Sequence, residues 1–287
     1  MTKTEGMRIR FLNLLREMRN AEIIIPLLAA AAMNLSYLMK IRDVLEPSET
    51  ISVLTPFLLI LCAPQLIPSP HFFMSAFTFF ILSNHLNTNQ MLYYRTIRTT
   101  RMKWIVSEIL RIMVISFLVI LFLFVCSVMA MIPKISLSVP WDYELPFWMD
   151  ALEGSWIGNI PYAIVYQLSQ AEAFVYALGF WWLYSVFGGL FLLTFRLLIP
   201  KVQGIGLGLL FVMYFFDYIC EYCLPYSFRY ASPVALSRLS YMNWGYDRIY
   251  PSPEYAICFF LICSLVLFVT DLLLARNVGF DMLTERT

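Results

Sequence analysis

Charged residues are scarce in this 287-residue chain, where Asp, Glu, Lys and Arg together make up only 14% of the sequence. Soluble globular domains usually contain about 25% charged residues. Hydrophobic residues make up 60% of the chain, and its mean hydropathy is +0.72. A soluble fold with so few charges would expose large apolar patches. The composition therefore excludes soluble, disordered and collagen-like proteins and indicates a membrane protein.

Motifs for catalysis and nucleotide binding are also missing. The chain has only two histidines, His71 and His85, and contains no GxxxxGK[ST], HExxH or GxSxG sequence. Its net charge of +1 is the difference between 20 basic and 19 acidic residues, whereas nucleic-acid binding needs a concentrated positive field. We therefore expect no catalytic residues, no metal site, no cofactor on this chain and no nucleic-acid partner.

Six cysteines are present, and most of them lie within apolar runs, where a free thiol behaves as a small apolar residue. Cys220 and Cys223 form a single CxxC motif. Without a second pair this motif is weak support for a disulfide or a zinc site. The sequence leaves open whether the two residues form a disulfide.

Long uncharged stretches predict the membrane spans, because a helix needs about 20 apolar residues to cross the hydrocarbon core. The uncharged stretch 51–94 is long enough for two crossings, but it contains four prolines, and the ProSerPro at 68–70 should break a helix. One interrupted crossing leaves the basic N-terminal tail and the basic cluster 95–103 on the same side. We therefore predict six spans: 23–40, 51–84, 108–132, 173–196, 202–220 and 255–274.

The distribution of basic residues predicts the orientation of these spans. Segments on the side of the N-terminal tail carry 13 Lys and Arg, and segments on the opposite side carry 6. Basic residues in short connections mark the cytoplasmic side, so we expect both termini in the cytoplasm. A charged leader of 22 residues precedes the first apolar run, which argues against a cleavable signal peptide. The expected fold is all-α: a single transmembrane domain over 1–287, crossing the plasma membrane several times.

Two kinds of helix are expected outside the spans. Within the leader 1–22, apolar residues recur at helical spacing opposite a basic face, which favours a cytoplasmic amphipathic helix lying on the membrane. The alternative is a surface helix packed on a partner. The outer segments 133–172 and 217–254 are rich in Trp and Tyr, which favour the membrane–water boundary. We expect short helices at the outer surface there, although an aromatic vestibule for a cationic molecule is an alternative.

Polar residues within the spans are the default functional candidates. Asn34 lies in the first span, and Asp217 lies near the end of the fifth. Glu108 and Arg111 are spaced to form an i, i+3 pair. Gly204 and Gly208 form a GxxxG motif, which lets two helices approach closely. No series of carboxylates runs through the middle of the membrane, so an ion-coupled carrier is not indicated.

The segment 85–104 is polar and then basic, and Arg95, Arg98 and Arg101 recur every three residues. On a helix this spacing makes a basic ridge. The ridge is explained either by anchoring at the cytoplasmic face or by docking of a cytoplasmic partner.

The layout of the chain resembles the permease subunits of type-2 ATP-binding-cassette exporters, particularly bacterial ones that export peptide antibiotics or give immunity to them. The features that carry the resemblance are the amphipathic leader, the large outer segments and a stretch after the second span that contains Tyr94-Arg95, Arg101, Lys103-Trp104 and Ser107. The acidic-then-glycine element usual ahead of this stretch is absent, and Asn87 and Asn89 stand in its place.

This resemblance implies that 85–104 is a coupling segment that docks on a separate pair of ATP-binding subunits, which bind the ATP and Mg²⁺. The partner-binding residues would be Tyr94, Arg95, Arg98, Arg101 and Lys103. A second permease half, identical or related, would complete the pathway, with Asn34, Gly204, Gly208 and Asp217 at the pathway or dimer interface. The exported substrate would be a peptide, a lipid or a drug-like molecule. Two alternatives remain: an intramembrane enzyme, which needs ionisable residues such as His71, Asp217 and Glu221 near one depth, and a membrane assembly factor that transports nothing.

Overall fold

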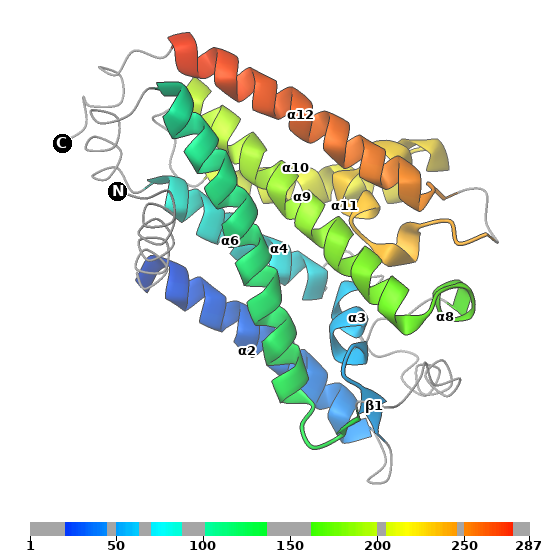
Figure 1. Cartoon of the computed structure of the whole chain (residues 1–287). Helices are drawn as coiled ribbons and strands as arrows, with labels where there is room; N and C mark the ends of the chain where they lie inside the picture. The colour runs from blue at the N-terminus through cyan, green and yellow to red at the C-terminus, as the bar shows by residue number, and fades with distance from the viewer. Residues whose placement is uncertain are drawn as a thin grey trace, which may run out of the picture.

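A computed structural model of the chain describes residues 21–44, 50–62, 70–87, 101–136, 162–199, 205–245 and 250–277. These residues are mostly helical and form a bundle of long helices (Figure 1). The long helices are α2 (Ala21–Val44), α4 (Pro70–Asn87), α6 (Arg101–Ala130), α9 (Gln170–Leu198), α10 (Ile205–Tyr222) and α12 (Pro253–Asn277). The short elements are β1 (Ile51–Ser52), α3 (Thr55–Leu61), β2 (Ile135–Ser136), α8 (Tyr162–Gln167), η1 (Tyr226–Ala231), α11 (Pro233–Leu236) and η2 (Leu239–Tyr241).

One end of the bundle, here called the β end, is defined by the strands. β1 pairs in parallel with β2, with Ile51 opposite Ile135, and this pairing joins the residues that follow α2 to those that follow α6. Gln170 Nε2 donates a hydrogen bond to Thr55 Oγ1 at 2.8 Å, which places the start of α9 beside the start of α3. The last turn of α2, the end of α6 and the start of α9 therefore share the β end.

The opposite end, here called the terminal end, is where α2 begins and α12 ends (Figure 1). Gly206 at the start of α10 lies against Ser83 near the end of α4. Thr194 near the end of α9 contacts Asp271 near the end of α12. Successive segments α2, α3–α4, α6, α9, α10 and α12 thus run along the bundle in alternating directions.

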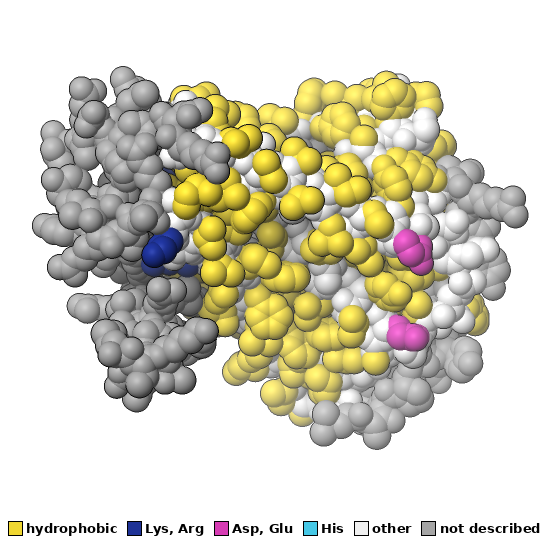
Figure 2. Space-filling model, turned by 45° about the horizontal axis from the view of Figure 1, so that its top comes forward, with side chains coloured by type: hydrophobic (Ala, Val, Ile, Leu, Met, Phe, Trp, Pro, Cys, Tyr) yellow, Lys and Arg dark blue, Asp and Glu magenta, His cyan; other side chains and the backbone are white. Residues whose placement is uncertain are grey.

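Four helices in the described residues are long and apolar enough to cross a membrane. The qualifying stretches are Ile23–Asp43, Met102–Ala130, Gln170–Leu198 and Pro253–Ala275. A continuous band of hydrophobic side chains covers the face shown in Figure 2, with basic side chains toward one edge and acidic ones toward the other. The prediction of an all-α membrane protein is therefore confirmed at this level, with one addition, the two-residue pairing of β1 and β2, which the sequence analysis did not predict.

Helix α9 is the centre of the bundle, and adjacent glycines allow its neighbours to approach closely. A Cβ on Gly188 would collide with the ring of Phe79 on α4, and a Cβ on Gly189 would collide with Ile112 on α6. Glycines at helix contacts let backbones approach and gain packing energy where lipid supplies no hydrophobic drive between helices. The Gly188–Gly189 pair therefore sets the spacing of three helices.

The start of α9 is fixed by a local signal. Ser169 accepts a hydrogen bond from the backbone N–H of Glu172, and the Glu172 carboxylate accepts one from the backbone N–H of Ser169 at 2.8 Å. This capping box satisfies two backbone donors that the first helical turn leaves free. The helix consequently begins at Gln170, three residues before the predicted span.

Several predicted segment boundaries differ from the structure. Within the predicted interrupted span 51–84 the described residues form two helices, α3 and α4, and α4 begins at Pro70, where proline suits the first helical turn. The last four residues of 85–104 belong to α6, which is one continuous helix of 30 residues. The amphipathic leader up to residue 20, the rest of the predicted coupling segment (88–100) and most of the outer segment 133–172 lie outside the described residues.

Candidate functional site

A cluster of polar and ionisable side chains lies buried toward the β end, between α4, α10 and the chain that follows α10. Tyr214, Asp217 and Glu221 recur at i, i+3 and i+7 and so share one face of α10. His71 and Ser75, one turn apart, face them from α4. The remaining members come from residues 226–245, here called the cap segment, which includes η1, α11 and η2.

The cap segment folds back into the bundle. Val234 and Leu236 are fully buried, and Leu239 is nearly so. Trp244 packs against Tyr176 of α9 with the ring centroids 5.4 Å apart. Short helices were predicted in this region, and η1, α11 and η2 are short helices that pack on the start of α9 and the end of α10.

His71 links α4 to both α10 and the cap segment. Its Nδ1 lies 2.6 Å from the hydroxyl oxygen of Tyr214, and its Nε2 lies 3.1 Å from Ser237 Oγ. The proton of Ser237 is engaged with the carbonyl of Val234 at 2.7 Å, so Ser237 accepts from His71 Nε2–H. In a neutral imidazole Nδ1 is then the acceptor, and the Tyr214 hydroxyl donates to it.

Arg238 is the largest charged side chain at the centre of the cluster and is fully buried. Its guanidinium lies 5.9 Å from the ring centroid of Tyr214 and 5.6 Å from that of Tyr241, within the range of cation–π attraction. It also hydrogen-bonds the side chain of Tyr214 and is attracted by the charge of Asp217. Tyr214 and Asp217 of α10 therefore hold Arg238 in place. Arg238 is the only charged residue of the cap segment that is completely buried.

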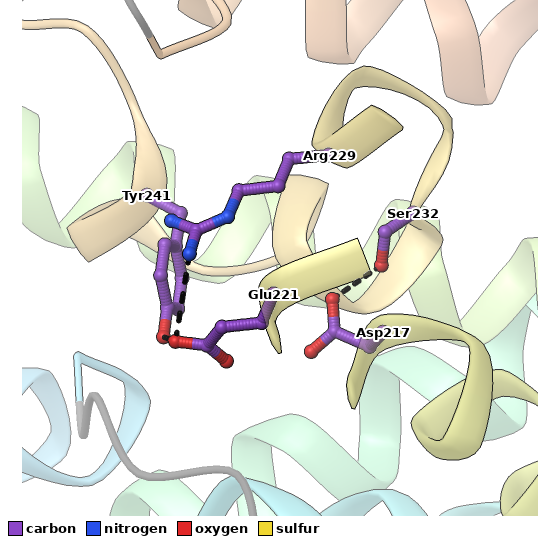
Figure 3. A network of polar contacts seen from close by, with 5 residues as sticks. All are labelled: Asp217, Glu221, Arg229, Ser232 and Tyr241. Atoms are coloured by element: carbon purple, nitrogen blue, oxygen red, sulfur yellow. Dashed lines mark hydrogen bonds and ion pairs between the residues drawn. The ribbon is translucent and has the colours of Figure 1, made fainter. Parts of the chain in front are cut away.

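Asp217 also stabilises a helix start within the cap segment. Ser232 Oγ donates to Asp217 Oδ1 and accepts the backbone N–H of Ala235, which makes Ser232 the N-cap of α11 (Figure 3). An N-cap hydroxyl satisfies a backbone donor in the first turn of a helix. The fold of this four-residue helix is thereby coupled to a carboxylate on α10.

A second group of contacts lies beside the first. Tyr241 Oη donates to Glu221 Oε1 at 3.0 Å, and Arg229 Nη2 lies 3.7 Å from the same oxygen (Figure 3). The Arg229 guanidinium also covers the ring of Tyr226 at 4.6 Å. Burial raises the pKa of the Tyr241 hydroxyl despite the opposing charge of Arg238, so the hydroxyl keeps its proton and remains a donor.

The chemical character of the cluster follows from its composition. Two carboxylates, Asp217 and Glu221, are balanced by two guanidinium groups, and both nitrogens of His71 are engaged by protein hydroxyls. Within the part of the chain that the structure describes, no three His, Cys, Asp or Glu residues gather as metal ligands. Such an arrangement is suited to holding chain segments together.

Other predicted site residues lie away from the cluster. Asn34 is buried within α2, and its Nδ2 has no hydrogen-bond partner among the described residues. Gly208 lies on the exposed face of α10 with open space where a Cβ would stand, and the close contact with α4 is made by Gly206. Lys103 is exposed near the start of α6, and the side chain of Arg101 at that start is outside the described residues, as are Tyr94, Arg95, Arg98 and Gly204.

Two polar contacts lie toward the terminal end. The predicted pair of Glu108 and Arg111 is confirmed, with Arg111 Nη1 donating to Glu108 Oε1 at 3.1 Å. Asp271 Oδ1 lies 2.7 Å from Thr194 Oγ1, and Asp271 is fully buried. These contacts join neighbouring turns or neighbouring helices at the opposite end of the bundle from the cap segment.

The two cysteines of the CxxC motif are free and differ in exposure. Cys220 is buried on α10, and Cys223 is exposed just beyond the end of that helix. They are not joined by a disulfide in this structure.

Sequence reasoning identified Asp217 as a site residue but did not identify Tyr214, Ser237 or Arg238. Tyr214 could have been found by its spacing from Asp217 and Glu221 on α10. Ser237 and Arg238 lie in a segment without periodicity, so no local pattern marks them. Comparison of the chain with protein families, curated proteins and solved structures gives no match.

Proposed function

We propose that this chain is the membrane-spanning permease subunit of an ATP-driven exporter, acting with a separate ATP-binding subunit and a second permease half. The observation that carries the proposal is the alternation of α2, α3–α4, α6, α9, α10 and α12 along the bundle. Six crossings of the membrane are the arrangement that this alternation supports. They leave the start of α2, the connection between α4 and α6, and the end of α12 on one side.

The charge of the chain supports the cytoplasm as that side. The connection between α4 and α6 contains Arg95 and Arg98, and Arg101 and Lys103 follow at the start of α6. Exposed Glu172 and Glu254 begin α9 and α12 at the opposite end. Basic connections remain in the cytoplasm, where a soluble ATPase is available. The plasma membrane is the proposed location, with both termini inside.

The proposed mechanism divides the work between subunits. The chain has no phosphate-binding loop of its own, so the free energy of ATP hydrolysis must enter through contacts with a partner. The basic ridge of Arg95, Arg98 and Arg101 is the proposed docking surface. Closure of the ATPase pair would then change the packing of α4 and α6, the two helices that the ridge joins. The proposed substrate is a peptide, a lipid or a drug-like molecule.

Charge reversal of the ridge tests this proposal. The tagged chain carrying R95E/R98E/R101E is purified from its native membrane and assayed for a co-purified subunit that an ATP photoaffinity probe labels. We expect the labelled subunit to be lost while membrane insertion is retained. The matched variant R95K/R98K/R101K keeps the charge and should retain the subunit. An unchanged yield of labelled subunit with the glutamate variant contradicts the docking role.

An intramembrane enzyme is the second candidate, and one observation favours it. His71, Asp217 and Glu221, which that function would need at a similar depth, do belong to one cluster. Against it, these side chains are bonded to protein groups, which leaves them poorly placed to act on a substrate. Single alanine variants at the three positions distinguish the candidates: an enzyme loses turnover with its fold intact, whereas a packing role changes stability. The remaining alternative, an assembly factor, predicts no ATP-dependent transport.

A further inference from the structure

We propose that the buried polar cluster is a latch that holds the cap segment closed over the β end and releases it as a unit during transport. This inference rests on the proposed function, because an exporter must open the end of the bundle that faces away from its ATPase. The latch consists of four side chains of the bundle (His71, Tyr214, Asp217 and Glu221) and five of the cap segment (Arg229, Ser232, Ser237, Arg238 and Tyr241).

The cap segment is bounded by features that suit a movable unit. Before it, Cys223 and Leu224 are exposed, and Pro225 precedes η1 without continuing α10. At its end, Gly245 has a φ of +96°, a conformation that other residues rarely adopt. Between these points the segment is held together internally, since Trp244 Nε1 donates to the carbonyl of Leu239 at 3.0 Å and Ser232 caps α11. The segment can therefore move without losing its own fold.

Besides the apolar packing of Val234, Leu236 and Leu239, polar contacts fasten the cap segment to α4 and α10. Ser237 reaches His71, Arg238 reaches Tyr214 and Asp217, and Tyr241 and Arg229 reach Glu221. A buried ion pair is often no more stable than apolar residues of similar volume, so its presence here is weakly explained by stability alone. When a site opens to water, polar groups can replace their protein hydrogen bonds with hydrogen bonds to water. Apolar side chains have no such compensation when they are exposed to water. A polar fastening therefore suits a surface that must open and close.

The contacts also converge on few residues, so release is expected to be cooperative. Asp217 contacts both Arg238 and the N-cap residue Ser232, and Tyr214 contacts both His71 and Arg238. Loss of Asp217 thus weakens the start of α11 together with the hold on Arg238. Packed interfaces with shared partners tend to have two states with little between them.

Cys220 provides a native probe for the release. It lies between Asp217 and Glu221 on α10, is buried, and is close enough to Arg229 of the cap segment to feel its charge. Opening of the cap segment exposes this thiol. Cys62, at the end of α3, is fully buried, and α3 packs on α4, α6 and α9, so Cys62 reports unfolding of the bundle as a whole.

The experiment measures thiol labelling of the full chain in lipid nanodiscs, without any ATPase. Two backgrounds retain only Cys220 or only Cys62, and each receives D217N, R238M or the control E254Q, which changes an exposed carboxylate at the same end. With a hydrophilic maleimide we expect D217N and R238M to label Cys220 at least about tenfold faster, because each leaves a buried charge without its partner. E254Q should not change the rate, and Cys62 should remain protected throughout.

Two other labelling results would contradict the latch proposal. Equal acceleration at Cys62 and Cys220 means that the cluster supports the whole bundle, and no acceleration at Cys220 means that the cap segment stays closed without it. The double variant D217N/R238M gives a further check, since coupled partners make its effect smaller than the product of the two single effects. Because no ATPase takes part in the labelling, failure of the latch can be distinguished from failure of the ridge as a docking surface.

Discussion

His71 and Ser237 are 166 positions apart in the sequence, and His71 Nε2 lies 3.1 Å from Ser237 Oγ. Because the proton of Ser237 is engaged with Val234, the histidine must be the donor in this contact. A single imidazole thereby fixes the relation between α4 and the cap segment.

Two replacements of His71 should distinguish the contributions of its two hydrogen bonds to stability. H71A removes both hydrogen bonds and leaves a cavity where the imidazole was buried, so we expect it to lower the free energy of unfolding by about 2–4 kcal/mol. H71Q keeps an amide donor that can reach Ser237 and should cost less. Denaturant unfolding in detergent micelles, followed by helical circular dichroism, measures both. Equal losses for the two variants would argue against a donor role for Nε2.

Gly188 should tolerate no side chain, because its position for a Cβ is occupied by the ring of Phe79. G188A is expected to lower the free energy of unfolding by about 1–3 kcal/mol. The matched control is G179A on the same helix, where nothing lies within 4 Å of the added methyl group. That control should be neutral or slightly stabilising, since alanine favours helix. A second change, F79L, should recover part of the loss in G188A by making room.

Asp271 should be replaceable by asparagine but not by alanine. Its Oδ1 lies 2.7 Å from Thr194 Oγ1, and an amide of the same shape preserves that contact. We expect D271N to change the free energy of unfolding by less than about 0.5 kcal/mol and D271A to lower it by about 1–2 kcal/mol. D43A, at an exposed position on α2, is the control for loss of a carboxylate. A loss from D271N as large as that from D271A would show that the negative charge itself is required.

Alkaline pH should weaken the fold through Tyr241. Its pKa is raised by burial, so above about pH 10 the unfolded chain gives up this proton while the folded chain keeps it. The contribution of Tyr241 is therefore complete below about pH 10 and is lost as pH rises toward the pKa in the folded state. Unfolding measured between about pH 9 and 11 should show this loss, and Y241F should reduce the slope. An unchanged slope in Y241F would assign the alkaline loss to other groups.

The apolar runs of the sequence were sufficient to predict the long helices, because burial in lipid or protein requires long uncharged segments. Their ends were less predictable. The start of α9 depends on the capping box of Ser169 and Glu172, and the start of α6 at Arg101 includes charged residues that a hydropathy criterion leaves out.

The candidate site was predictable only where it follows helical periodicity. Asp217 and Glu221 stand out on α10 because ionisable residues are rare in apolar helices. In the sequence, Arg238 is indistinguishable from the other basic residues of the connection between α10 and α12. Its burial depends on how η1, α11 and η2 fold back on the bundle. Likewise, the GxxxG motif at 204–208 predicted a close helix contact at Gly204 and Gly208. Among the described residues the tight contacts are at Gly188, Gly189 and Gly206, because contact depends on which neighbour each glycine faces.

The short pairing of β1 with β2 has a mechanical consequence for the whole molecule. Ile51 N–H donates to the carbonyl of Lys134 at 2.9 Å, and Lys134 Nζ donates to the carbonyl of Arg42 at 3.1 Å. These two hydrogen bonds join the tips of α2, α3 and α6 at the β end, so a displacement of one tip is passed on to the other two.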